Sequence, residues 1–188
     1  MFVDVLDADS AAALLKHGGV IAYPTEGVWG LGCDPRNERA VMRILAIKQR
    51  EVEKGLILIA ASEAQLAPFV ALEALGDEQR AAVRASWPGA ATWIVPASPS
   101  APRWISGAHD GIAVRVSAHP PVIALCNACG GALVSTSANR AGGAAPTRKT
   151  GLDPEVVALL DGVLDGETGG LLQPTPIRDA RSGAVLRG

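Results

Sequence analysis

Short apolar runs of strand length alternate with segments of helical spacing along most of this chain. The pattern predicts strands at residues 20–23, 56–60, 92–96, 111–116 and 132–136, with shorter ones near 163–164, 177–178 and 185–186. It predicts helices at residues 10–16, 38–48, 63–66, 77–85 and 121–129, and a last one capped by Asp153 with Pro154 at its first position. Strands that alternate with helices are typical of an α/β or α+β fold around one sheet. The length of 188 residues predicts a single domain over residues 1–188.

Composition and charge exclude several classes of protein. The chain is 48% apolar, yet its apolar runs are far too short to span a membrane. Its first residues resemble no secretory signal, so we expect a cytoplasmic protein that does not contact a membrane. With 17 basic and 19 acidic side chains the net charge is −2, which argues against bulk affinity for nucleic acid but allows a local basic cleft.

The cysteine pattern predicts packing rather than metal binding. Cys126 and Cys129 form a CxxC pair inside a predicted helix, and the remaining cysteine is Cys33. Four zinc ligands would need a second pair, and the sequence contains neither another CxxC nor an HxxxH. An odd cysteine count also argues against a disulfide framework. We therefore expect these cysteines to pack within the fold.

Two pairs of polar residues stand out because each pair is separated by one residue. Lys48 and Arg50 lie where a helical pattern ends, and Ser137 and Asn139 follow an apolar strand. In an extended chain, positions i and i+2 point to the same side, whereas in a helix they do not. If both segments are extended, the two cations can meet the hydroxyl and the amide around a phosphate or carboxylate. The alternative for the cations, together with Lys54, is a solvated helix end.

Further candidates lie at the ends of predicted strands or within them. Arg115 interrupts an otherwise apolar strand, so it must face a cleft, an edge or a partner. Thr25 and Glu26 follow a buried strand directly, a position at which α/β sheets often bind ligands. His119 precedes two prolines and is interpreted as a turn residue. The sequence contains no complete phosphate loop, dinucleotide fingerprint, HExxH or GxSxG motif.

Several blocks of this chain, in the same order, resemble the YrdC/TsaC family. They are residues 22–34, Lys48-Gln49-Arg50 with Lys54-Gly55-Leu56, residues 113–116, residues 135–139, residues 166–170 and residues 177–179. The resemblance covers nearly the whole chain and is strongest to the short bacterial type. It implies a twisted mixed sheet flanked by helices around a large basic cavity. It also implies L-threonylcarbamoyladenylate synthase activity, in which L-threonine, bicarbonate and ATP give threonylcarbamoyl-AMP and pyrophosphate for tRNA modification.

The resemblance also implies roles for individual residues. The family's Lys-x-Arg and Ser-x-Asn motifs fall on Lys48, Arg50, Ser137 and Asn139, the four residues that the spacing had already selected. The remaining assignments are threonine binding by Thr25 and Arg115, and nucleotide binding by Lys54, Thr175 and Arg178. Thr175-Pro176 departs from the Ser-Thr pair found in many members. The resemblance further implies that ATP is a substrate and that Mg²⁺ accompanies it without a metal ligand from the protein. It implies a tRNA threonylcarbamoyl-transferase complex as the recipient of the product.

Two other functions are compatible with parts of the pattern. In the first, the cations grip phosphates of tRNA or double-stranded RNA weakly, although the chain lacks an aromatic and basic surface pattern. In the second, Ser135 or Ser137 is the nucleophile of a hydrolase, although no base is recognisable near either serine. Threonine-dependent ATP turnover separates the synthase from both.

Overall fold

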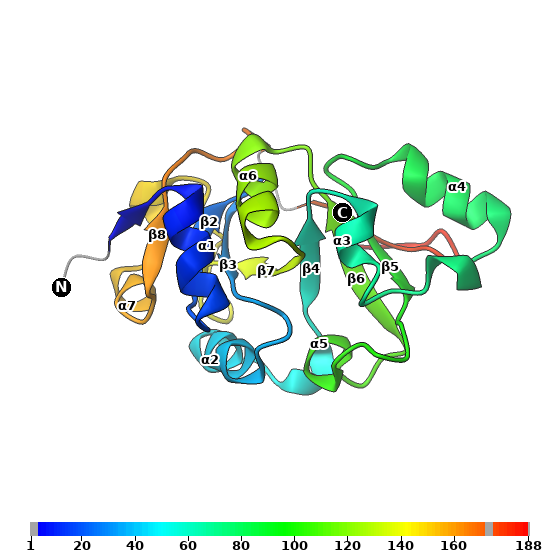
Figure 1. The fold of residues 1–188 in the computed structure, drawn as a ribbon, viewed down its shortest axis with the longest axis horizontal. Helices are drawn as coiled ribbons and strands as arrows, with labels where there is room; N and C mark the ends of the chain where they lie inside the picture. The colour runs from blue at the N-terminus through cyan, green and yellow to red at the C-terminus, as the bar shows by residue number, and fades with distance from the viewer. Residues whose placement is uncertain (1–3, 172–174, 188) are drawn as a thin grey trace.

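A mixed sheet runs through the whole molecule in the computed structural model, which describes residues 4–171 and 175–187 (Figure 1). Within these residues ten strands follow the order β1-β8-β2-β3-β7-β4-β6-β5-β9-β10. Their bounds are β1 Val5–Leu6, β2 Ile21–Pro24, β3 Trp29–Gly32, β4 Ile57–Ala60, β5 Thr92–Pro96, β6 Gly111–Val116, β7 Leu133–Ser137, β8 Gly162–Leu164, β9 Ile177–Asp179 and β10 Val185–Arg187. The predicted α/β class is confirmed, and one continuous sheet is what a single domain requires.

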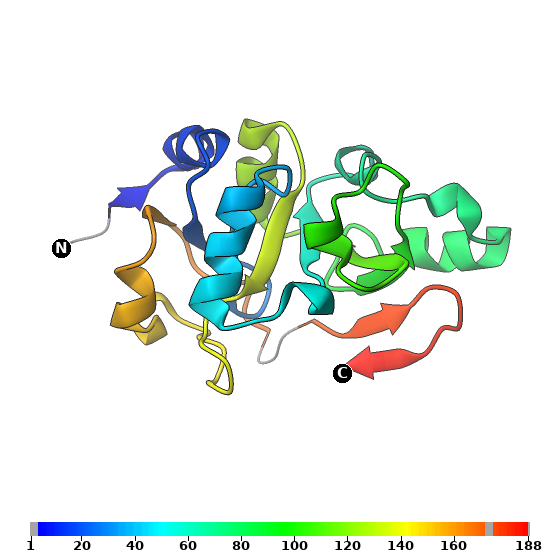
Figure 2. The ribbon, with the colours of Figure 1, turned by 90° about the horizontal axis from the view of Figure 1, so that it is seen from below.

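Helices cover both faces of this sheet. Their bounds are α1 Ala8–Lys16, α2 Glu38–Lys48, α3 Glu63–Leu66, α4 Asp77–Ala85, α5 Arg103–Ser106, α6 Pro120–Cys129 and α7 Pro154–Val157. Helices α1 and α6 pack on Ile21, Tyr23 and Ile59, whereas α2 packs on the alternate residues Ala22 and Leu31. Side chains alternate between the faces of a sheet, so the two apolar clusters lie on opposite sides. Figure 2 shows the β9–β10 hairpin and the loop after β7 on the side away from α1 and α6.

The predicted helices exist, and capping decides where they begin. Helix α1 begins at Ala8 rather than at residue 10, because the Asp7 side chain accepts the Ser10 N–H at 2.8 Å. Helix α4 has Gly76 as its N-cap, so the predicted cap at Asp77 was wrong; Asp77 is the first helical residue. The predicted cap of the last helix is confirmed, since Asp153 accepts the Glu155 N–H at 2.8 Å.

The sequence pattern did not predict strand β3, because its two glycines are poor strand formers. The structure requires a small residue at Gly32, where a β-carbon would lie 2.6 Å from Tyr23 Cε1 and 2.9 Å from the Val134 carbonyl oxygen. Strand β3 pairs with β2 on one side and with β7 on the other. It thereby joins the residues around Thr25 to those around Ser137.

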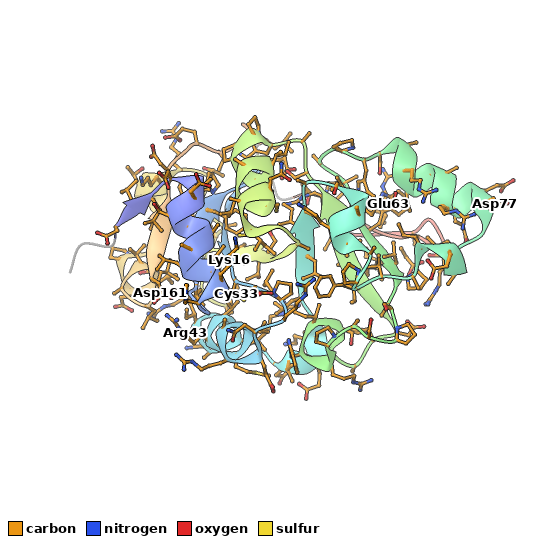
Figure 3. All side chains as sticks on the ribbon, viewed as in Figure 1. Lys16, Cys33, Arg43, Glu63, Asp77 and Asp161 are labelled. Carbon is orange, nitrogen blue, oxygen red and sulfur yellow. The ribbon has the colours of Figure 1, made fainter. Side chains whose placement is uncertain are left out.

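An ion pair holds α2 against the sheet. Arg43 on α2 contacts Asp161 at 2.8 Å, and Asp161 also accepts the Val20 N–H at 2.7 Å, just before β2 (Figure 3). Both charged groups are about one-third exposed, so their Coulomb energy is modest. The contact nevertheless sets the position of the helix whose last residue is Lys48.

Cysteines pack within the fold. Cys126 is buried on α6 with its thiol 3.7 Å from the Ile59 carbonyl oxygen, and burial raises the pKa of both Cys126 and Cys129. Among the described residues no group of three His, Cys, Asp or Glu side chains could hold a metal ion. In the same part of the chain, no helix combines the length and the apolar character needed to cross a membrane.

Candidate active site

The side chain of Lys48 joins the two polar pairs that the sequence analysis selected. Its Nζ donates to the carbonyl oxygens of Ser137 and Asn139, each at 2.5 Å. The same nitrogen lies 3.2 Å from Ser137 Oγ and 3.2 Å from Asn139 Oδ1. Lys48 is 7% exposed, so these contacts are largely shielded from water. Three of the four predicted residues therefore form one cluster, which we call the Lys48 clamp.

The backbone around Lys48 is not extended, so this part of the expectation was wrong. Lys48 is the last residue of α2, and Gln49 adopts the left-handed conformation with φ 48°. The Gln49 and Arg50 N–H groups donate to the carbonyls of Ala46 and Leu45, the bonding pattern of a Schellman motif. This motif ends the helix and separates the directions of the two cations. Lys48 reaches the end of β7, whereas Arg50 turns toward its own loop.

The partner segment does follow an extended strand. Ser137 ends β7, and the next residue, Ala138, is buried with its N–H bonded to the Trp29 carbonyl at 2.8 Å. Asn139 Nδ2 donates to the carbonyls of Arg140 at 2.9 Å and Gly143 at 2.7 Å. The Asn139 side chain thus closes the glycine- and alanine-rich loop that follows and presents its oxygen to Lys48.

Arg50 and Lys54 line the edge of a hollow of about 440 Å³. Arg50 Nη2 donates to the carbonyls of Lys54 at 3.2 Å and Gly55 at 3.0 Å, which fixes the loop that contains the 3₁₀ turn η1, Val52–Lys54. The Lys54 ammonium is 60% exposed and lies 3.4 Å from the Glu51 carboxylate. The lining combines apolar side chains with polar and charged ones, among them Ile57, Ile94, Ala113, Ile177, His109, Asp110, Asp179 and Arg181.

Arg115 lies on the same face of the sheet as Ala113, which lines this hollow. Ala113 pairs with Ile94, and Arg115 comes two residues later on β6, so the two side chains share a face. Arg115 is 5% exposed. Its Nη1 contacts Thr175 Oγ1 and lies 3.2 Å from Thr92 Oγ1, and its Nη2 lies 3.3 Å from Glu26 Oε2. The expectation that Arg115 needs a partner is met by a buried carboxylate.

Glu26 is a buried charged residue to which the sequence analysis gave no role. Its Oε1 accepts a hydrogen bond of 2.6 Å from Ser117 Oγ. Within the described part of the chain, its Oε2 and the Nε of Arg115 are buried without a hydrogen-bond partner, so the ion pair leaves polar capacity on both sides. The sequence did contain one indication of a role for Glu26, because a charged residue directly after a buried strand is unusual.

Thr25 is held by its own turn and by a segment that runs alongside. Its Oγ1 donates to the Val28 carbonyl at 2.7 Å, and its carbonyl accepts the Gly169 N–H at 3.0 Å. The Leu171 N–H donates to the Glu26 carbonyl at 3.0 Å. Gly169 passes so close that a β-carbon there would lie 3.0 Å from the Glu26 carbonyl oxygen. Residues 25 and 26 are therefore fixed from both sides.

Arg178 does not join the other predicted residues. On β9 it pairs with Trp93, and its guanidinium carbon lies 5.7 Å from the centre of that ring. Trp93 pairs with Val114, so Arg178 points to the face opposite Arg115. The neighbouring residue Ile177 lines the hollow instead. A role of Arg178 toward a nucleotide stays a prediction.

The charge state of Lys48 decides between two kinds of chemistry. Burial and then the positive charge of Arg50 lower the pKa of Lys48 to about 8. A serine beside a lysine can act as nucleophile and base, and Ser137 Oγ lies 3.2 Å from this nitrogen. However, the contacts to two carbonyls at 2.5 Å are those of a charged donor, which has no lone pair to accept a proton. The Lys48 clamp is thus arranged to donate hydrogen bonds.

Comparisons with known proteins give matches over nearly the whole chain. A protein-family model described as Sua5_yciO_yrdC, telomere recombination, matches residues 13–188. The chain is 64% identical over 182 residues to the threonylcarbamoyl-AMP synthase of Stenotrophomonas maltophilia (strain K279a), covering 97% of this chain and 98% of the relative. It is 60% identical over 181 residues to the protein of that name from Xanthomonas campestris pv. campestris (strain B100), covering 96% and 97%.

Solved structures share the fold. The structure of P. abyssi Sua5 complexed with L-threonine matches with a TM-score of 0.84 and 30% identity, over 92% of this chain and 50% of that chain. E. coli YciO matches with a TM-score of 0.78 and 25% identity, over 96% and 87%. This chain therefore spans about half the length of the P. abyssi Sua5 chain and most of YciO.

Proposed function

Because this chain belongs to the Sua5/YciO/YrdC family, we propose that it is a threonylcarbamoyl-AMP synthase. It joins L-threonine, bicarbonate and ATP and releases pyrophosphate. The observation that carries the proposal is the Lys48 clamp, in which one buried ammonium gathers Ser137 and Asn139 beside the cations of the next loop. The relatives that match almost end to end at 56–64% identity have this activity in their names.

The hollow beside Arg50 and Lys54 suits a nucleotide. Its apolar side chains can receive a base, while the two cations at its edge neutralise phosphate oxygens. Transfer at phosphorus depends on positioning and charge stabilisation more than on a protein nucleophile. Thr175 and Arg178 are proposed to border the nucleotide. Thr175 would do so from its position beside Arg115. Arg178 would first have to move its side chain away from the Trp93 ring. Mg²⁺ would be held by the phosphates and by water, because the described residues provide no cluster of metal ligands.

Threonine is assigned to the region of Arg115 and Thr25. The guanidinium provides donors for a carboxylate, and Thr25 directly precedes Glu26, which pairs with Arg115. Support comes from the related P. abyssi Sua5, which was solved in complex with L-threonine. The two ends of the proposed site lie along one face of the sheet. Threonine and ATP can therefore bind side by side.

The residues then perform the reaction by holding the two reactants in line. The amine of threonine must be unprotonated to form a carbamate with bicarbonate or carbon dioxide. A carbamate oxygen attacks the α-phosphorus, and the bond to the β-phosphate oxygen breaks. Lys48 keeps Ser137 and Asn139 at the end of β7, where the Ser137 hydroxyl can donate to a reacting oxygen and the Asn139 amide, which donates to the Arg140 and Gly143 carbonyls, holds the adjoining loop. Arg50 with Lys54 stabilises the departing pyrophosphate.

The test is incubation with ATP, Mg²⁺, labelled bicarbonate and one of several amino acids, with detection of pyrophosphate and of the labelled carbamoyl-adenylate. We expect product with threonine and little with serine, valine or alanine. Absence of threonine-dependent pyrophosphate release, together with salt-sensitive tRNA binding, would favour the RNA-binding alternative. In the cell we place the protein in the cytoplasm, where its product passes to a tRNA threonylcarbamoyl-transferase complex.

A further inference from the structure

Glu26 and Arg115 form a buried pair of opposite charges. The relative exposure is 7% for Glu26, in the loop after β2, and 5% for Arg115, on β6. A buried charge without a partner destabilises the folded state, so each of the two charges needs an opposite charge or hydrogen bonds. Arg115 donates hydrogen bonds to two neutral threonine hydroxyls and forms an ion pair with one carboxylate. Glu26 is thus the group that balances its charge.

The contacts of Glu26 orient it toward Arg115. Ser117 Oγ, just beyond β6, fixes Oε1 at 2.6 Å, which leaves Oε2 facing the guanidinium at 3.3 Å. The Glu26 backbone is held as well, because its carbonyl accepts the Leu171 N–H at 3.0 Å and Gly169 lies against it. Among residues 4–171 and 175–187, neither Oε2 nor Arg115 Nε has a hydrogen-bond partner. The pair is fixed in place yet unsaturated, as expected of a group prepared for a ligand.

We propose that Glu26 is the positioning residue of the threonine end of the site: it holds Arg115 and cancels its charge, so that this end favours a zwitterionic amino acid over a simple anion. The proposal rests on the proposed function, in which Arg115 contacts threonine. A zwitterion carries no net charge, so a balanced pair can bind it without a strong field. A bare buried guanidinium would instead attract phosphate or sulfate, which accompany ATP chemistry.

The test is Glu26→Gln, which retains the size of the side chain and an oxygen for Ser117 but removes the charge. We expect the KM for threonine to rise at least about tenfold while the KM for ATP changes less than about twofold. We also expect inorganic sulfate to inhibit the variant in competition with threonine, but not the wild type. Ser117→Ala, which retains both charges but loses the orienting hydrogen bond and the acceptor of the His119 N–H, should raise the KM for threonine about two- to fivefold.

The matched control is Glu63→Gln. Glu63 also pairs with an arginine, Arg84, at 2.6 Å, but on α3, at the surface. It should leave both KM values unchanged. A purely structural role of Glu26 would lower the melting temperature and affect both substrates equally, and this result would overturn the proposal. So would a Glu26→Gln protein with an unchanged KM for threonine, or one that sulfate does not inhibit.

Arg115→Met separates this inference from the proposed function. If the KM for threonine is unchanged in Arg115→Met, the assignment of threonine to this end of the site is wrong. If Arg115→Met raises it and Glu26→Gln does not, only the positioning role of Glu26 fails. If the wild-type protein makes no threonine-dependent pyrophosphate, the proposed function itself fails.

Discussion

Replacing Lys48 with methionine should abolish most of the activity while the protein stays folded. The change retains most of the aliphatic stem and removes the ammonium that contacts four oxygens of Ser137 and Asn139. Removing one preorganised donor at such a site lowers turnover by about 10²–10³-fold. We therefore expect pyrophosphate release to fall by about that factor in Lys48→Met.

Two opposing effects determine the stability of this variant. Hydrogen bonds to a charged group contribute about 1.5–3 kcal/mol each, and Lys48→Met loses them. Burial and Arg50 lower the pKa of Lys48 from 10.5 to about 8, so keeping its charge in the folded state costs about 3 kcal/mol, which methionine removes. The two contacts at 2.5 Å together contribute about 3–6 kcal/mol, so the net destabilisation is about 0–3 kcal/mol, and we expect the melting temperature to fall by no more than about 12 °C.

The assay compares pyrophosphate release per folded protein with thermal unfolding followed by circular dichroism. Lys16→Met is the control, because Lys16 also donates to a carbonyl, that of Ala128 at 3.0 Å, but lies on the exposed side of α1 (Figure 3). It should retain full activity. Turnover of Lys48→Met within about fivefold of the wild type would refute the role of the clamp in catalysis.

Three further predictions follow from the same contacts. The pKa of Lys48 is about 8 in the folded protein and 10.5 in the unfolded chain, so between these pH values only the unfolded chain keeps the proton. Raising the pH from 7 to 10 should therefore stabilise the wild type relative to Lys48→Met by about 2–3 kcal/mol, measured by urea unfolding. An equal pH dependence of the two proteins would contradict this. Gly107→Ala should raise the KM for ATP about five- to tenfold. Gly107 has φ 65°, and a β-carbon there would lie 2.7 Å from the Gly55 nitrogen, in the loop that carries Lys54. Gly142→Ala is the control, because Gly142 has φ 78° but a β-carbon there would meet nothing within 4 Å. A serine-directed phosphonate should not label Ser137, and labelling detected by mass spectrometry would revive the hydrolase alternative.

Local signals predicted most of the fold because they act within a few residues. The helix over Glu38–Lys48 was predicted with its bounds, since its apolar spacing is regular and Asn37 caps it. Strand β3 was not predicted, because Gly30 and Gly32 are explained only by the Tyr23 ring and the β7 backbone that lie against them. A requirement for small residues that arises from neighbouring strands leaves no periodic pattern in the sequence.

The sequence predicted which residues belong to the candidate site better than it predicted how they are arranged. The one-residue spacing selected Lys48, Ser137 and Asn139, although Lys48 reaches them from a helix end through a left-handed Gln49. The spacing could not show that Arg178 points to the face opposite Arg115, because this depends on the register of β9 against β5. The pairing of Glu26 with Arg115 also joins residues that are distant in the sequence.

The distribution of charge within the site separates its two ends and weakens the RNA-binding alternative. Lys48 and Arg50 contact carbonyl, hydroxyl and amide oxygens, and the described residues place no carboxylate in hydrogen-bond contact with either. That end therefore offers the charges of Lys48 and Arg50 to a triphosphate, while Asp110 and Asp179 also line the hollow. At the other end Glu26 balances Arg115, as a zwitterion requires. A surface that binds an RNA backbone needs exposed cations, yet Lys48 and Arg115 are 7% and 5% exposed. Their charges can reach only a small ligand that enters the fold.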